Sequence, residues 1–396
     1  QKLYLDRSYD TAFEAEVISA RTREDGTVAV VLDRTLFYPE SGGQLPDGGV
    51  LGGFTVSDVQ EGESESVVHA VHGPIEPGAR VSGAVDWSRR FDHMQQHTGQ
   101  HVLSRAFIAT GGLHTVSFHM GMETCTIDLD GSGFDAAAVR RAEDLANGVI
   151  AENRPIDITT VPVEELDQIE LRRKVPEGVR AARIVSVRDF DVIPCCGTHV
   201  RSTGELGTIK VLKSERVRQT QRVHFKVGRR AFDDYRDKHD IVAALANQLT
   251  TAPPDLTAKV GRLAADAQTA ARRAKTLIER LAAAEGPRLA AAAARAGDIR
   301  LLVHRDPDPA YVRALASEVQ GGAKTVAILG ADDGTVVCVA SRDVELDLAT
   351  GAPELARELG GSGGGRGGFV QLKLADGTHV EELMTRMDAH VRSRLA

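Results

Sequence analysis

Two short segments place potential metal ligands four residues apart. His97 and His101 lie in HTGQH, and Cys195 and His199 lie in CCGTH, nearly a hundred residues later. The first segment reads as helix, and residues i and i+4 of a helix share one face, so its two imidazoles can reach one ion. Gly197 argues against a regular helix in the second segment, where a turn would bring thiolate and imidazole together.

Three imidazoles and one thiolate form a nitrogen and sulfur set that suits a tetrahedral zinc ion. The sequence therefore predicts one Zn²⁺ per chain, held by His97, His101, Cys195 and His199. His93 and Cys196 are competing ligands. We prefer Cys195 over Cys196 because Cys195 pairs with His199 at the same offset as the histidine pair. Whether four protein ligands make the zinc structural, or one yields to substrate, stays open.

Composition and length narrow the class of protein. A chain of 396 residues with 42% apolar residues favours two or three domains with packed cores. It has no run of eighteen apolar residues, and its first residues, QKLYLDRSYD, do not resemble a signal peptide. Its four cysteines are too few for a disulfide scaffold and favour a reducing compartment. We expect a cytoplasmic protein that does not enter a membrane.

Local patterns predict an α+β chain of four parts. Short alternating runs between Gly and Pro turns predict a small β-barrel or sandwich over residues 1–88. Helices and strands alternate over 89–230, the expected zinc domain, with one helix ending at Gly111 and Gly112. Residues 231–296 read as a helical linker, and 297–396 read as a small α/β domain.

The helical linker carries its own predictions. The segment TTAPPD breaks it, and apolar residues follow at alternating spacings of four and three from Leu256 to Ala284. This heptad seam fits an antiparallel helical hairpin or a dimeric coiled coil, and the latter would make a homodimer through the C-terminal half. We expect Gly286 and Pro287 to kink or end the second helix.

Residues 210–230 hold eight Lys or Arg and one Glu, although the whole chain has a net charge of −8. The basic residues interleave with Val and Phe at strand-like spacing, as in an edge strand. A solvated face would explain such a run, and so would a surface that contacts phosphates.

Together these residues resemble the editing domain of alanyl-tRNA synthetases and their free-standing relatives, the alanyl-tRNA editing (AlaX) proteins. HTGQH and CCGTHV match the family's HxxxH and CxxxH signature, and LDRTLFYPESGGQLPDGG is similar to its TxFYPxxGGQxxDxG segment. RVHFKVG resembles the following basic strand, and GGSGGGRGGFVQ resembles a segment of the C-terminal DHH-associated domain. Cys196 stands where the family commonly has Gly. The resemblance spans the chain in order and implies the long form of the protein.

The resemblance implies a zinc-dependent deacylase that hydrolyses mischarged seryl-tRNA(Ala), and glycyl-tRNA(Ala) as well. It makes Thr35 the partner of the serine hydroxyl, lets the backbone at Gly42 and Gly43 approach the terminal adenosine, and places Gln44 among the substrate-binding residues. Gln100 would orient water or the ester carbonyl. The expected tRNA contacts are Lys210, Lys213 and Arg222 on the basic strand and Arg366 in the C-terminal domain.

Three other functions compete with editing of tRNA(Ala). One is a non-catalytic, zinc-stabilised tRNA-binding protein, and another is editing of a different mischarged tRNA. A phosphoesterase related to the DHH nucleases is disfavoured because no Asp-His-His motif occurs. No ATP-binding class II core is apparent, so we do not expect the chain to charge tRNA.

Overall fold

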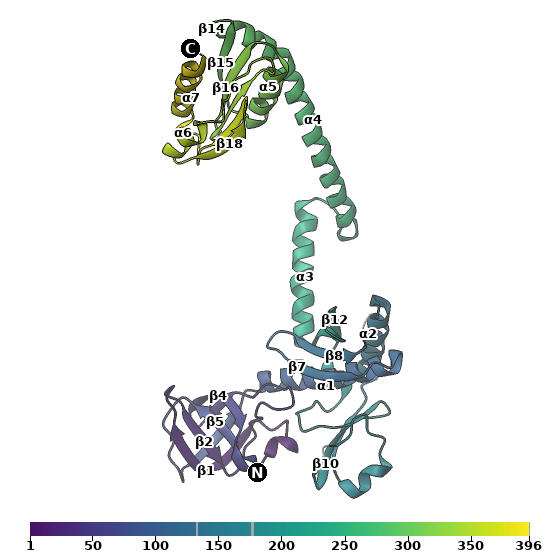
Figure 1. Cartoon of the computed structure of the whole chain (residues 1–396). Coiled ribbons are helices and arrows are strands. Elements are labelled where there is room, and N and C mark those ends of the chain that lie inside the picture. The colour runs from purple at the N-terminus through teal and green to yellow at the C-terminus, as the bar shows by residue number, and fades with distance from the viewer. Residues whose placement is uncertain (132–133, 176–177, 396) are drawn as a thin grey trace. The chain divides into compact units, whose positions relative to one another are not determined.

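A computed structural model describes residues 1–131, 134–175 and 178–395 (Figure 1). The chain divides into two compact units, Gln1–Ala244 and Leu245–Ala396. Both contain helices and sheets, which confirms the α+β class, while the finer division into four parts stays a proposal. Among the described helices, none is long and apolar enough to span a membrane.

The N-terminal strands close into a barrel, which confirms the barrel over the sandwich (Figure 1). Around the barrel the order is β1 (Ala12–Thr22), β2 (Val28–Leu32), β5 (Val67–Val71), β4 (Phe54–Glu61), β3 (Gly49–Leu51) and β6 (Arg80–Val85). Alternate residues of β1 and β6 are buried, as the period of a strand requires. The barrel core contains Phe13, Val30, Phe37 and Val59.

The helix α1 (Trp87–Gly111) follows the barrel and carries HTGQH. The side chain of Asp86 caps its start by accepting from the Arg89 N–H at 3.2 Å. Gly112 ends it in the left-handed region with φ 65°, so the predicted end at Gly111 and Gly112 is confirmed. Most of the middle of α1 is buried, which makes it the central element of this unit.

Two antiparallel sheets accompany α1. The first has the order β12 (Ile209–Val217), β13 (Thr220–Val227), β8 (Cys125–Asp130) and β7 (Thr115–Met120). The second has the order β11 (Asp191–Pro194), β10 (Ala181–Val187) and β9 (Ile156–Pro162). The helix α2 (Ala136–Ala151) packs on α1 through Ala142, Ala146 and Val149. Within the basic segment, β12 is an edge strand as expected, and β13 lies inside the sheet.

A buried ion pair joins the barrel to α1. Arg90 of α1 and Asp47, which lies just before β3, are both fully buried. The Arg90 guanidinium donates to Asp47 Oδ1 at 3.1 Å and to the carbonyl oxygens of Leu36 at 2.5 Å and Ser8 at 2.8 Å. The Tyr38 N–H donates to Asp47 Oδ2 at 2.6 Å. One guanidinium therefore holds three separate backbone segments against the helix.

The linker forms two helices, α3 (Arg229–Gln248) and α4 (Leu256–Ala292), and TTAPPD lies between them as predicted. The helix does not end at Gly286 and Pro287 but continues to Ala292, while a kink at these residues stays a prediction. Packing outweighs the missing N–H of Pro287 here: a Cβ on Gly286 would lie 3.3 Å from Leu315 and Glu318 of α5 (Pro309–Gly321). The helix surface and α5 are in direct contact at this turn.

The face of α4 that packs within the second unit is not the predicted heptad seam. Ile278, Ala282 and Leu289 join the core formed with α5. Seam residues such as Val260, Leu263, Leu277 and Leu281 are exposed, at 45–63% of their surface. The hairpin and the homodimer therefore both stay predictions.

The second unit contains a six-stranded sheet between helices. Its order is β14 (Ala294–Ala296), β15 (Ile299–Asp306), β16 (Thr325–Ala331), β17 (Thr335–Ala340), β19 (Phe369–Lys373) and β18 (Ser362–Arg366). The strands β16 and β17 are buried throughout, because α5 covers one face while α6 (Ala352–Glu358) and α7 (Val380–Leu395) cover the other. Most of the glycine-rich run GGSGGGR is ordered: residues Ser362–Arg366 form the exposed edge strand β18.

Candidate metal centre and adjoining cavity

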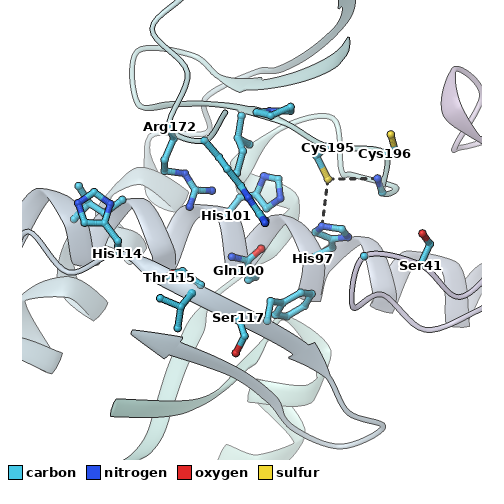
Figure 2. Close-up of a pocket in the computed structure, with 18 of the residues that line it drawn as sticks. Ser41, His97, Gln100, His101, His114, Thr115, Ser117, Arg172, Cys195 and Cys196 are labelled. Atoms are coloured by element: carbon cyan, nitrogen blue, oxygen red, sulfur yellow. Dashed lines mark hydrogen bonds between the residues drawn. The ribbon is translucent and has the colours of Figure 1, made fainter. Parts of the chain in front are cut away.

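The four predicted ligands meet in space. One ligand atom each from His97, His101, Cys195 and His199 lies within 4.8 Å of the others. The three imidazoles are buried, and only Cys195 is partly exposed. The helix α1 supplies two of these residues one turn apart, and the loop after β11 supplies the other two; Figure 2 shows His97, His101 and Cys195. His93 and Cys196 lie outside this group, so the structure brings together the preferred set.

The spacing of the donor atoms suits a small tetrahedral cation. Cys195 Sγ lies 3.4 Å from His97 Nε2 and 3.3 Å from His199 Nε2. Zinc bonds to sulfur and to imidazole nitrogen would place such atoms about 3.5 Å apart at the corners of a tetrahedron. Three nitrogens with one thiolate are also a ligand set that zinc prefers.

Burial leaves the histidines neutral and ready to act as ligands. It lowers the pKa of His97 to about 3 and the pKa values of His101 and His199 well below the ordinary value. Burial also raises the pKa of the Cys195 thiol to about 11. A bound cation would therefore displace the proton of the Cys195 thiol, and the resulting thiolate would coordinate the cation.

Gln44 fixes the orientation of His97. Its Oε1 accepts from His97 Nδ1 at 2.7 Å and from the Thr198 N–H at 3.1 Å, and its Nε2 donates to Thr198 Oγ1 at 2.8 Å. With the proton on Nδ1, His97 Nε2 points its lone pair at the cluster. This arrangement, an imidazole held from behind by an oxygen, is typical of metal sites.

Thr98 does the same for His199. Its Oγ1 accepts from His199 Nδ1 at 3.0 Å and from the Val200 N–H at 3.2 Å. The buried Nδ1 of His101 has no hydrogen-bond partner among the described residues. A buried imidazole nitrogen without a partner is costly, and a metal ion bound to this nitrogen would compensate for that cost.

The ligand loop has two further requirements, Gly197 and Arg183. A Cβ on Gly197 would lie 2.2 Å from His97 Cε1, so only glycine fits between the two ligand segments. Arg183 of β10 donates to the carbonyl oxygens of Cys195 at 2.7 Å and Gly197 at 3.0 Å, and to Leu5 at 2.9 Å. Sequence reasoning missed Arg183, although an arginine inside the apolar run ARIVSV was a signal.

A cavity of about 510 Å³ opens beside the cluster (Figure 2). His97, His101 and Cys195 line it, so three of the four ligands border the empty space. Its walls mix apolar and polar side chains, among them Tyr38, Ile108, Ser117, Phe118, Ile193 and Arg172. A partly polar cavity beside a metal-binding set is the arrangement expected of a substrate site.

The predicted substrate residues take different places around this cavity. Gly42 and Gln100 line it. Gln100 donates from Nε2 to Ser104 Oγ at 2.8 Å, which fixes its side chain beside the ligands. Gly43 instead packs on β7, where its carbonyl accepts from the Met120 N–H at 3.0 Å, and a Cβ there would lie 2.7 Å from the Phe118 carbonyl oxygen. Gln44 lies behind His97, as described above.

Thr35 is not among the residues that line the cavity. Its side chain is buried, and its hydroxyl donates to His69 Nε2 at 2.9 Å while accepting from the Phe37 N–H at 3.0 Å. The contact with the serine hydroxyl stays a prediction.

The predicted phosphate contacts on the basic strands are paired with acidic side chains. Lys210 Nζ lies 2.6 Å from Glu143, Lys213 Nζ lies 3.0 Å from Glu215, and Arg222 bonds both oxygens of Asp128. Arg366 ends β18 and is exposed. Arg172 and Arg173, which sequence reasoning did not single out, line the cavity instead, and Lys174 follows them in the chain.

Two family models match parts of the chain. Residues 182–224 match the threonyl and alanyl tRNA synthetase second additional domain, and residues 8–89 match the class II (A) tRNA synthetases. The first match contains Cys195 and His199, and the second contains the barrel strands and Gln44.

Several curated proteins are similar over nearly the whole chain. The alanyl-tRNA editing protein AlaX-L of Pyrococcus horikoshii is 30% identical over 92% of each chain. The alanyl-tRNA editing protein Aarsd1 of Rattus norvegicus is 28% identical over 98% of each chain. The alanine–tRNA ligase of Pyrococcus abyssi is 30% identical over 96% of this chain but only 42% of the ligase. Among solved structures, the C-Ala domain of Aquifex aeolicus alanyl-tRNA synthetase matches 25% of this chain with 20% identity and a TM-score of 0.22, too low to support an argument.

Proposed function

The chain belongs to the alanyl-tRNA editing protein family, and we propose that it hydrolyses the ester of mischarged seryl-tRNA(Ala) and glycyl-tRNA(Ala). The products are the free amino acid and uncharged tRNA(Ala), so alanine codons are not mistranslated. Hydrolysis of the aminoacyl ester makes the protein a deacylase that acts on tRNA already released by the synthetase.

The need for such an enzyme follows from the limits of binding selectivity. A pocket built for the methyl group of alanine cannot strongly exclude glycine, which is smaller, or serine, which adds one hydroxyl. A second site can test for the hydroxyl directly, since polar partners discriminate better than apolar volume does.

The observation that carries the proposal is that the ligand cluster faces a cavity. His97, His101 and Cys195 all line it, so an ester in the cavity would lie beside the ion-binding atoms. A zinc ion bound there would polarise a carbonyl or lower the pKa of a water molecule. This placement favours a catalytic role over a purely structural staple.

The side chains around the cluster would supply orientation. Gln44 and Thr98 hold His97 and His199 with their Nε2 lone pairs directed at the cluster. Gln100 is held by Ser104, and its Oε1 would accept from the attacking water or from the serine hydroxyl. Phe118 and Ile193 would exclude bulk water from the ester.

The remaining site assignments are part of the same proposal. Thr35 would select serine, as the family resemblance implies, while Gly42 would let the terminal adenosine approach the cavity wall. Arg222, Lys210 and Lys213 would contact the acceptor stem, and Arg366 would contact tRNA from the second unit.

The decisive experiment compares release of serine, glycine and alanine from tRNA(Ala) by the wild type and by a His97→Ala, Cys195→Ala variant. Bound zinc and tRNA affinity are measured on both proteins. We expect fast, selective release of serine or glycine by the wild type only, together with loss of zinc in the variant. Zinc and tight tRNA binding without hydrolysis would leave a non-catalytic tRNA-binding protein, and release from a different mischarged tRNA would reassign the substrate.

A further inference from the structure

Three consecutive cations border the proposed ester site. Arg172 and Arg173 line the cavity that contains His97 and Cys195. Arg173 and Lys174 line an adjoining cavity of about 500 Å³, which also borders Cys195 and Cys196. We call residues 172–174 the cationic rim. Cys195 and Cys196 of the ligand loop line both cavities, and the rim borders both.

The first residue of the rim anchors it. Arg172 Nε donates to Asp191 Oδ1 at 2.8 Å, and the Arg172 N–H donates to the Val192 carbonyl at 2.9 Å. The Asp191 side chain is 1% exposed, so this ion pair is held inside the protein next to β11. The position of the rim beside the cavity is thereby fixed by β11, the strand that leads into the ligand loop.

The other two residues have no acidic partner among the residues that the structure describes. Arg173 and Lys174 are exposed, and neither forms an ion pair or a side-chain hydrogen bond with any residue that the structure describes. Two positive charges without partners at the border of a cavity raise the local concentration of anions there.

The basic strands β12 and β13 differ in this respect. Their cations Lys210, Lys213 and Arg222 already have carboxylate partners within 3.0 Å. A phosphate approaching them would also approach Glu143, Glu215 and Asp128, which would repel it. These three cations are therefore poorer partners for an anion than Arg173 and Lys174.

We propose that Arg173 and Lys174 bind the phosphates of the single-stranded 3′ end of tRNA, with Arg172 positioning them. The inference rests on the proposed function, because an ester at the metal cluster places the nearest phosphate one ribose away. A guanidinium fork and an ammonium group both suit phosphate oxygens. The rim would thus recognise the end of the acceptor strand, and the basic strands would add little.

The test measures binding of uncharged tRNA(Ala) and of the same tRNA trimmed of its single-stranded 3′ end. The variant is Arg173→Ala, Lys174→Ala. A matched control, Arg21→Ala, Arg23→Ala, removes the same charge from two exposed arginines at the end of β1, neither of which is in a salt bridge with a described residue. The rival surface is tested with Lys210→Ala, Lys213→Ala. Zinc content and melting temperature verify that each variant is folded.

We expect the rim variant to bind intact tRNA roughly tenfold more weakly or worse, and the slope of log affinity against log salt to fall by about 1.4. Trimmed tRNA should bind the wild type and the rim variant equally. With mischarged tRNA, KM should rise while kcat stays unchanged.

Three results would overturn the inference: a rim variant that binds like the wild type, an equal loss in the barrel control, or a loss that persists with trimmed tRNA. Because uncharged tRNA is the probe, binding through the rim without any deacylation would refute only the proposed function. Deacylation with rim-independent binding would refute only the rim.

Discussion

At the scale of single residues, Gly197 determines whether the two ligand segments can meet. A Cβ at this position would lie 2.2 Å from His97 Cε1 and 2.9 Å from Gln44 Oε1. We therefore expect Gly197→Ala to displace His97 and to lower the zinc affinity by roughly tenfold or more. Metal titration with a competing chelator measures this. Gly148→Ala in α2, where a Cβ meets nothing within 4 Å, is the matched control and should bind zinc normally.

Gln44 offers a second test, because it is not among the residues that line the cavity and it holds His97 through Nδ1. Gln44→Leu leaves His97 Nδ1 and the Thr198 N–H without their acceptor, and we expect metal affinity to fall by about 10–100-fold. Gln44→Glu keeps the acceptor for His97 and should restore most of the affinity. Equal losses in both variants would contradict the orienting role.

The four ligands could be predicted because each pair shares a short spacing and a chemistry that few other functions need. Gln44 could be placed at the site only through the family resemblance, and its contact with His97 spans 53 residues. Arg183 was missed because its partners, too, are far away in the sequence. It binds backbone carbonyls that carry no side-chain signal, and these come from the ligand loop and from Leu5.

At the scale of elements, the junction between barrel and α1 depends on the Arg90–Asp47 pair. Arg90→Met would leave the fully buried Asp47 carboxylate without its cation, with the Tyr38 N–H still donating to it, and would remove the guanidinium donor of two carbonyl oxygens. We expect a loss of about 3–5 kcal/mol in the free energy of unfolding, measured by denaturant titration. Arg7→Met breaks the exposed pair with Asp10 and should cost less than about 1 kcal/mol. A similarly small loss of stability in Arg90→Met would contradict this role of the buried pair.

Local signals predicted most of the elements correctly, and tertiary contacts explain the exceptions. Gly111 and Gly112 end α1 because backbone geometry alone determines a C-cap. Pro287 does not end α4, because contact with α5 stabilises the turn. The basic character of β12 and β13 was visible in the sequence, but the carboxylates that neutralise it come mainly from α2 and β8, elsewhere in the chain.

At the scale of the whole molecule, all four candidate metal ligands lie in the unit Gln1–Ala244, while Leu245–Ala396 has its own cores. We expect calorimetry of the full chain to show two transitions, because two units with separate cores need not unfold together. Removal of zinc should lower only the transition of the first unit, since a ligand stabilises the unit that binds it. Gly197→Ala should lower the same transition. If removal of zinc shifted both transitions, the assignment of the zinc site to the first unit alone would be contradicted.

The distance in sequence between the two ligand segments also has a consequence during synthesis. Cys195 leaves the ribosome 98 residues after His97, which at about 5–20 residues per second is a delay of roughly 5–20 seconds. For that time the nascent chain carries two histidines on one helix face without their sulfur partner. The four-residue cluster is therefore complete only late in translation of its unit, and an ion that needs all four ligands would bind only after the loop from β11 has docked.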